Sequence, residues 1–145
     1  MKKKPTVSQL KKKLWTLFSE YIRLRDSLAM GSFTHATCCT CGKVYPSFGK
    51  GCLQAGHYIP GRHNSYLFEE QGCHAQCYNC NINMKGNPIP YRRFMIETYG
   101  EERTKEIEEL YYQKKQFKPY ELEEMIEVCK AKLSDLKQSE KYLPF

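Results

Sequence analysis

Four of the eight cysteines in this 145-residue chain form two Cys-x-x-Cys pairs. Cys38 and Cys41 make the first pair, and Cys77 and Cys80 make the second. A spacing of two residues allows one tight turn to direct both sulfurs at the same ion, and two such pairs supply the four thiolates of a tetrahedral structural zinc site. We therefore predict that these four cysteines bind zinc. Cys39 is an alternative partner for Cys41, but the two-residue spacing favours Cys38.

Three of the four histidines lie between the two cysteine pairs: His57, His63 and His74. The 35 residues that separate the pairs exceed the spacing of a common zinc finger, so this insert carries something beyond the metal-binding turns. Imidazole titrates near neutral pH and can therefore take a proton from water. Asn81 directly follows the last cysteine, where its side chain could bind an ion or cap a helix.

The combined pattern resembles the NinG (Rap) family of recombination proteins from lambdoid phages. The resemblance covers roughly residues 14–100. It rests on the first cysteine pair and on residues 15–25 (W-T-L-F-S-E-Y-I-R-L-R), 55–59 (A-G-H-Y-I), 74–81 (H-A-Q-C-Y-N-C-N) and 86–87 (G-N). The cysteine pairs followed by an asparagine are also similar to zinc-stapled phage endonucleases that resolve Holliday junctions. These resemblances imply an α+β fold with a ββα-metal core of the HNH type, stapled by the four-cysteine zinc site.

The resemblance also implies roles for individual side chains. By position, His57 matches the general base that takes a proton from the attacking water. Asn81 matches the ligand of a catalytic Mg²⁺ or Mn²⁺ ion, which would stabilise the charge that develops at the scissile phosphate. The products would be a 5′-phosphate and a 3′-hydroxyl. A strand-end histidine without a catalytic role and a helix-capping asparagine are the alternatives.

Two glycines depart from the wider HNH pattern. Gly56 stands where an acidic residue or a histidine that binds the metal usually precedes the base, and Gly72 stands where the central asparagine is expected. His74 is therefore a candidate catalytic residue, as a replacement ligand or as a partner that orients a ring. Glu69 and Glu70 are candidates for the carboxylate ligand that Mg²⁺ prefers, with ordinary surface positions as the alternative.

Positive charge is concentrated in the part of the chain that carries these motifs. The net charge is +7, and residues 1–99 contain 14 Lys and Arg against 5 Asp and Glu. Such a surplus is typical of a surface that binds DNA phosphates, although six lysines within the first 13 residues could form only a solubilising tail. The basic residues that we expect to contact DNA are Arg62, Lys85, Arg92 and Arg93. Candidate stacking surfaces for separated strands are Tyr58, Tyr66 and Tyr91.

The remaining segments are predicted to position this site within a single domain, residues 1–145. A leading helix is expected over residues 6–26, because Thr6 and Gln9 form a capping-box pattern before a helical apolar stripe. The zinc-stapled HNH-like core is expected over residues 36–87. Its predicted elements are strands at 36–45 and 51–59, a polar loop at 60–65 and a helix at 77–85.

Helical bracing is expected over residues 88–140. Helical patterns run over residues 90–99 and from Glu101 to Lys115, with Gly100 as the break between them. A last helix begins at Pro119 and carries Cys129 on its apolar stripe, where a small core residue is the simplest interpretation.

We predict a metal-dependent, structure-selective DNA endonuclease that acts on branched intermediates, such as a Holliday junction or a D-loop, in phage recombination. The main alternative is a zinc-dependent DNA-binding recombination module without catalysis, and a further alternative is a sequence-unspecific nicking nuclease for defence or packaging. Neither a signal peptide nor a membrane span is recognisable, so we expect a cytoplasmic location in the bacterial host. A homodimer is a candidate assembly, because symmetric cutting needs two active sites and the first and last helices offer apolar faces. A recombinase is a candidate partner.

Overall fold

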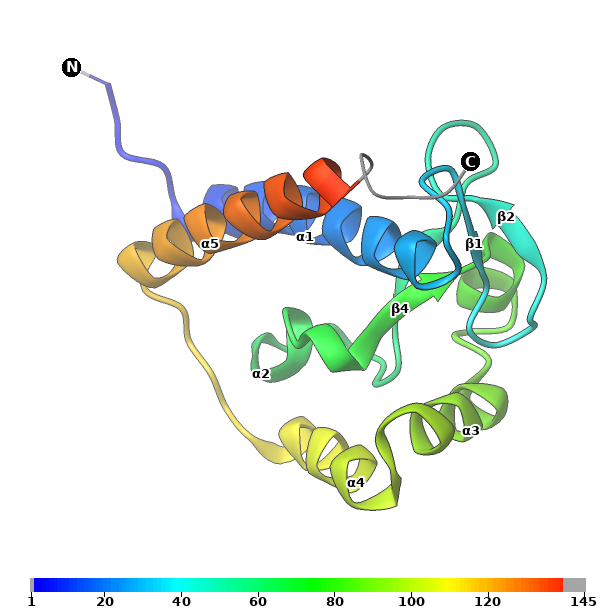
Figure 1. Cartoon of the computed structure of the whole chain (residues 1–145). Helices are drawn as coiled ribbons and strands as arrows, with labels where there is room; N and C mark the ends of the chain where they lie inside the picture. The colour runs from blue at the N-terminus through cyan, green and yellow to red at the C-terminus, as the bar shows by residue number, and fades with distance from the viewer. Residues whose placement is uncertain (1, 140–145) are drawn as a thin grey trace.

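In the computed structural model, which describes residues 2–139, two long helices lie side by side, the first of them packs on two small sheets, and shorter helices complete the opposite side (Figure 1). Helix α1 (Val7–Ala29) begins at the predicted capping box. The Thr6 hydroxyl accepts a hydrogen bond from the Gln9 N–H, and the Gln9 side chain accepts one from the Thr6 N–H. Satisfying these otherwise unpaired donors contributes about 1 kcal/mol to helix stability. The predicted leading helix is confirmed and extends to Ala29.

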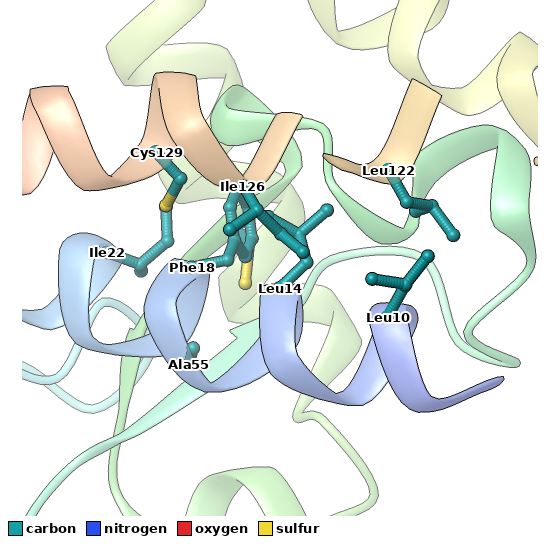
Figure 2. Packing of buried hydrophobic residues seen from close by; sticks show 9 residues of the cluster. Leu10, Leu14, Phe18, Ile22, Ala55, Leu122, Ile126 and Cys129 are labelled. Carbon is teal, nitrogen blue, oxygen red and sulfur yellow. The ribbon is translucent and has the colours of Figure 1, made fainter. Parts of the chain in front are cut away.

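Helix α1 packs along helix α5 (Pro119–Gln138) through the apolar faces of both helices (Figure 2). The buried side chains in this contact are Leu10, Leu14, Phe18 and Ile22 from α1, and Leu122, Ile126 and Cys129 from α5. Full burial of an aliphatic or aromatic side chain of this size contributes about 1.5–3 kcal/mol. Cys129 is the core residue that its position on the stripe predicts. The two apolar faces that were candidates for a dimer contact already cover each other within one chain.

The first sheet is a short hairpin of β1 (His35–Thr37) and β2 (Val44–Pro46). The expectation of one strand over residues 36–45 is wrong, because the chain reverses direction at the first cysteine pair. The Cys38 N–H donates to the Lys43 carbonyl at 2.8 Å, and the Gly42 N–H donates to the Cys38 carbonyl at 2.9 Å. The metal-binding turn is therefore the loop of the hairpin.

The second sheet pairs β3 (Gln54–His57) with β4 (Cys73–Gln76) in antiparallel register, with Gly56 opposite His74 and His57 opposite Cys73. Strand β3 lies within the predicted 51–59 segment, whereas β4 was not predicted. All four residues of β4 are buried, so the strand lacks the alternation of apolar and polar residues that marks a half-exposed strand. One face of this sheet packs on α1 through Ala55 and Cys73.

Short helical turns follow both strands. Helix α2 (Asn64–Leu67) and the turn η1 (Glu70–Gly72) connect β3 to β4, so the predicted polar loop at 60–65 ends in a helix at Asn64. The predicted helix at 77–85 is present as a π-helical turn, η2 (Asn79–Asn83), which begins just after Cys77. Wide turns of this kind are frequent at functional sites.

The remaining helices close the opposite side of the molecule (Figure 1). They are α3 (Pro88–Tyr99), α4 (Glu101–Glu109) and η3 (Leu110–Tyr112). The break at Gly100 is as predicted, with a positive φ of 87° that favours glycine. The chain is thus a mixed α+β fold with two two-stranded sheets. Residue 1 and residues 140–145 lie outside the described residues. They include the first position of the predicted domain and the last position of the predicted bracing segment.

Within residues 2–139, no helix is long and apolar enough to cross a membrane.

Candidate functional site

The four cysteines of the predicted metal site come together. The Sγ atoms of Cys38, Cys41, Cys77 and Cys80 all lie within 4.8 Å of one another, and all four thiols are free. A tetrahedral zinc site with Zn–S bonds of about 2.3 Å has sulfur–sulfur edges of roughly 3.8 Å. The Cys41 and Cys77 sulfurs are 3.9 Å apart, so the cluster could bind a structural metal ion such as zinc. Cys39, the alternative partner, is not a member of the cluster.

The surroundings of the cluster favour a thiolate at Cys38. Burial opposes ionisation of Cys38, but hydrogen bonds from the Thr40 hydroxyl and from backbone N–H groups outweigh it and lower the pKa of this thiol to about 6. The Cys77 N–H donates to the Cys38 sulfur at 3.3 Å, and the Cys80 N–H donates to the Cys77 sulfur at 3.4 Å. Burial and the neighbouring sulfurs raise the pKa of Cys41 to about 12. Without a cation, a second thiolate beside the first is therefore disfavoured.

A pocket of about 300 Å³ opens beside the end of β3. Five of the residues singled out from the sequence line it: His57, Tyr58, Arg62, Asn81 and Lys85. They come from the last residue of β3, the loop after it, the π-helical turn and the bend that follows that turn. The residues that line this pocket include no Asp or Glu. The pocket therefore combines a titratable ring and two cationic side chains with a neutral carboxamide.

The imidazole of His57 is held on two sides. Its Nε2 lies 2.9 Å from the main-chain oxygen of Leu67. Because a carbonyl oxygen only accepts, the proton of the neutral ring belongs on Nε2, and Nδ1 is left as the nitrogen that can take up a proton. The ring also stacks on the indole of Trp15 from α1, with centroids 5.2 Å apart and an interplanar angle of 22°. Burial and the charge of Arg62 lower the pKa of His57, against the opposing effect of the Leu67 carbonyl.

Trp15 also contacts Arg62, which was predicted to bind DNA. The Arg62 guanidinium lies 4.3 Å from the centroid of the Trp15 ring, and its backbone has a φ of 52°, an unusual value for a residue with a side chain. One indole thus contacts both the histidine and the arginine of the pocket. The sequence carries no local signal for this role, although Trp15 is the single tryptophan of the chain.

Asn81 lies inside the π-helical turn and is not its N-cap. Its backbone N–H donates to the Cys77 carbonyl at 2.9 Å, which ties it to the cysteine cluster. Its side-chain Nδ2 donates to Oε1 of Gln54 at 2.7 Å. This bond fixes the orientation of the carboxamide through its nitrogen, so the oxygen remains the atom that can bind a ligand.

His74 does not join His57 in the pocket. His57 lies opposite Cys73, whereas His74 lies opposite Gly56, one position further along the pair of strands. Successive positions face opposite sides of a sheet, so the two histidine side chains point to opposite faces. His74 is only 3% exposed, and its Nε2 lies 2.6 Å from the Tyr99 hydroxyl. Burial and the charge of Arg25 lower its pKa to about 3. In this position the ring is a neutral packing group against Tyr91, Phe94 and Tyr99. The Tyr91 hydroxyl also donates to the carbonyl of Gly56, the strand partner of His74, at 2.6 Å.

Glu69 and Glu70 also lie away from the pocket. Glu69 forms an ion pair of 3.2 Å with Arg103, and Glu70 forms one of 2.9 Å with Lys132. Both partners come from the C-terminal helices α4 and α5. The structure thus places the two predicted magnesium ligands in contacts that join the β3–β4 connection to these helices, and not beside Asn81.

Gly56, which stands where HNH enzymes usually have a ligand, faces the side chain of Gln76. A Cβ atom added at Gly56 would lie 2.1 Å from Oε1 of Gln76 and 2.9 Å from its Cβ. Gln76 is fully buried, and its Nε2 donates to the Gly86 carbonyl at 2.8 Å and to Thr40 at 3.1 Å. Its Oε1 has no hydrogen-bond partner among the described residues. The glutamine therefore occupies the space that a side chain at position 56 would need.

Arg92 and Arg93 line a second groove, which adjoins the pocket. Arg92 forms an ion pair of 3.5 Å with Glu108. The prediction that Tyr66 and Tyr91 offer stacking surfaces is wrong, because their rings are 2% and 0% exposed. Tyr58 is partly buried and its hydroxyl donates to Glu108 at 2.7 Å.

Comparisons with known proteins show to which family the chain is similar. The family model described as Bacteriophage Lambda NinG protein matches residues 1–141. The chain is 33% identical over 110 residues to Protein ninG of Escherichia phage lambda, a match that covers 70% of this chain and 48% of that protein. It is 36% identical over 93 residues to Protein ninG of Enterobacteria phage H19B, covering 59% of this chain and 42% of that protein.

The chain spans less than half the length of these two curated relatives. No solved structure matches it. The family match extends over nearly the whole sequence, from the leading helix through the cysteine cluster to helix α5. The chain therefore belongs to the NinG family of bacteriophage proteins.

Proposed function

We propose that this NinG-family protein is a structure-selective DNA endonuclease of the HNH type, with zinc in the four-cysteine cluster. The observation that carries the proposal is the hydrogen bond of 2.9 Å between Nε2 of His57 and the Leu67 carbonyl, at the edge of a pocket that also holds Asn81. It supports the assignment of His57 as general base, because it places the proton of the neutral ring on Nε2 and leaves Nδ1 as the nitrogen that can take a proton from water. The order of β3, β4 and a short helical turn that carries Asn81 also supports the proposal, because a ββα core has two strands followed by a helix.

In the proposed reaction, Nδ1 of His57 takes a proton from water as the water oxygen attacks the scissile phosphorus. The bond between phosphorus and the 3′ oxygen breaks, which leaves a 5′-phosphate and a 3′-hydroxyl after the leaving oxygen gains a proton from solvent. Arg62 and Lys85 supply positive charge to the phosphate from the same pocket. The lowered pKa of His57 keeps the imidazole neutral, and therefore able to accept a proton, at neutral pH.

Asn81 would hold Mg²⁺ or Mn²⁺ through its carboxamide oxygen, and the chemistry that such an ion supplies is stabilisation of charge at the leaving 3′ oxygen. This donor set fits the ion only when DNA is present, because the lining of the pocket contains no carboxylate. Magnesium sites commonly use few protein ligands and complete their shell with water and substrate phosphate oxygens. We therefore expect the ion to bind together with the substrate.

The preference for branched recombination intermediates comes from the family resemblance. Under the same proposal, the protein acts on DNA in the cytoplasm of the infected bacterium. A dimer that cuts two strands symmetrically and a recruiting recombinase remain proposals that depend on the family context. A dimer would have to use a surface other than the contact between α1 and α5, which is buried within the chain.

The proposal is tested by incubating zinc-loaded protein with a four-way junction and with a linear duplex of the same sequence. Each substrate is treated with Mg²⁺ and without any added divalent ion, because a strong chelator would also remove the structural metal. The expected result is cleavage of the junction, with little cleavage of the linear duplex, in Mg²⁺ alone. Equal cleavage of both substrates would contradict the structure-selective part of the proposal.

One observation favours a second function. The lining of the His57 pocket lacks an acidic residue, and Gln76 fills the place of the usual ligand before His57. A protein with these features could bind branched DNA through its basic residues without cutting it. Stable binding to the junction with no product in Mg²⁺ or Mn²⁺ would support this non-catalytic module over the endonuclease.

A further inference from the structure

The second groove continues the His57 pocket along the surface. It has a volume of about 760 Å³ and lies between the segment after β3, helices α3 and α4, and the turn η3. Four lining residues belong to both spaces: Tyr58, Ile59, Pro60 and Pro88. A strand whose phosphate lies in the His57 pocket would therefore pass directly into the groove.

Large apolar side chains are unusually exposed on the walls of this groove. Tyr112 is 77% exposed, Ile89 is 71% exposed and Tyr111 is 46% exposed. The Tyr111 ring is held in place by stacking on His63, with centroids 5.3 Å apart, and by an edge contact of 5.2 Å with Tyr112. Fixed aromatic rings that face solvent are suited to stack on the bases of an unpaired strand, since every base has a flat face.

The charges of the two spaces are arranged to receive such a strand. Arg62 and Lys85 line the His57 pocket, and Arg92 and Arg93 line the groove. Two carboxylates, Glu108 and Glu109, also line the groove, and Glu108 is already contacted by Arg92 at 3.5 Å and by the Tyr58 hydroxyl at 2.7 Å. Within residues 2–139 Arg93 forms no ion pair, which leaves its guanidinium able to contact a phosphate.

We propose that this groove binds an unpaired segment of DNA next to the scissile phosphate, with a base stacked on Tyr112. The proposal rests on the proposed function, in which the His57 pocket receives that phosphate. The basic residues favour a nucleic acid over an apolar protein segment, and the exposed rings favour unpaired bases over a continuous duplex. A volume of 760 Å³ falls within the usual range for a bound molecule of about 300–1,000 Å³, enough for a splayed nucleotide. Contact with unpaired bases would give the protein a physical means to distinguish a branch from a linear duplex.

The test measures binding without cleavage, in buffer with no added divalent ion. A splayed-arm duplex carries 2-aminopurine at the first unpaired position, and a blunt duplex of the same sequence is the reference. The wild-type protein should prefer the splayed duplex and quench the 2-aminopurine fluorescence. Tyr112→Ala should weaken binding to the splayed duplex about 5- to 150-fold, the range expected for loss of one stacked base, and leave blunt-duplex binding unchanged. Tyr112→Phe keeps an aromatic ring and should behave like the wild type.

Tyr120→Ala is the matched control, because Tyr120 is a 63% exposed tyrosine on α5, outside the groove. It should change neither affinity. The proposal is overturned if Tyr112→Ala binds both duplexes as the wild type does. It is also overturned if that variant alters the sedimentation of the free protein instead, which would make the groove a contact between copies of the chain. If the wild type proves unable to cut DNA but Tyr112→Ala still loses the splayed-arm preference, the groove assignment stands and the enzyme assignment fails.

Discussion

Nε2 of His57 lies 2.9 Å from the main-chain oxygen of Leu67, ten residues further along the chain. This contact joins the end of β3 to helix α2, which follows it in the chain. Together with the indole of Trp15 on the face of the ring, it leaves the imidazole one free nitrogen and little freedom to rotate. In the proposed role of general base, a ring held in this way would not need to be reoriented before each turnover.

The first prediction concerns the pH dependence of cleavage. Burial and the Arg62 charge lower the pKa of His57, so cleavage should persist below pH 6.5, about the ordinary pKa of a histidine, before it declines in acid. Arg62→Gln removes the nearby positive charge and should move the acid limb of kcat/KM to higher pH, in addition to weakening DNA binding. The profile of kcat/KM against pH, measured by single-turnover cleavage, tests this.

Arg93→Gln is the control for loss of a positive charge, since Arg93 lines the adjoining groove and not the His57 pocket. Its acid limb should coincide with that of the wild type. A limb that stays in place, or moves to lower pH, in Arg62→Gln would refute the assignment of His57 as the titrating base.

The second prediction concerns the cysteine cluster. Cys77→Ser removes one of four sulfurs and should release the metal, because the remaining ligands no longer complete a tetrahedral shell. Zinc sites of this type contribute roughly 10 kcal/mol or more to folding, so the variant should lose cooperative unfolding as well. Metal content by mass spectrometry and thermal unfolding by circular dichroism are the measurements.

Cys52→Ser is the matched control, because Cys52 is partly buried and lies outside the cluster. It should keep its metal and its cooperative transition. If Cys77→Ser retained one equivalent of zinc and the transition of the wild type, the four cysteines would not form the site.

The third prediction tests why position 56 is glycine. Gly56→Ala places a Cβ 2.1 Å from Oε1 and 2.9 Å from Cβ of the fully buried Gln76, so we expect a loss of about 1–3 kcal/mol in the free energy of unfolding. The same substitution in a Gln76→Ala background should cost less, because the obstructing side chain is gone. Urea unfolding of the two single variants and the double variant gives the coupling energy. Additive losses would mean that Gln76 is not what excludes a side chain here.

The fourth prediction concerns His74. Its folded-state pKa of about 3 lies below the ordinary value of about 6.5, so the native state binds fewer protons than the unfolded state between these values. Stability is therefore fully present above pH 6.5 and falls as the pH drops from 6.5 towards 3, by an amount on the order of a few kcal/mol. His74→Phe should reduce that slope. Urea unfolding at pH 7 and at pH 4.5 gives the difference for each protein, and an equal fall in both would show that His74 is not the group responsible.

The sequence predicts best those features that depend on neighbouring residues. Thr6 and Gln9 are three positions apart and mark the start of α1, and the cysteine spacing predicts the metal cluster. Strand β4 was missed because its four residues are all buried and do not alternate. The hairpin of β1 and β2 was missed because the metal-binding turn interrupts what reads as one strand.

The predicted site differs from the structure where the deciding contact is distant in the sequence. Glu69 and Glu70 are placed by Arg103 and Lys132, which follow them by 34 and 62 residues. The pairing of β3 with β4 turns His74 to the face of the sheet opposite His57, and the spacing of the histidines alone does not reveal that pairing. Trp15 reaches His57 across 42 residues, and no motif marks that contact.

Replacement of His57 by alanine is the most direct test of the central claim. We predict that His57→Ala keeps its zinc, a cooperative thermal transition and its affinity for a four-way junction, but cleaves the junction about 10²- to 10⁴-fold more slowly in Mg²⁺, the usual contribution of a general base. His35→Ala, which removes an exposed histidine of β1 outside the pocket and the groove, should cut at the rate of the wild type. Cleavage by His57→Ala at the wild-type rate would contradict the account, because the residue held by Leu67 and Trp15 would then not be the base.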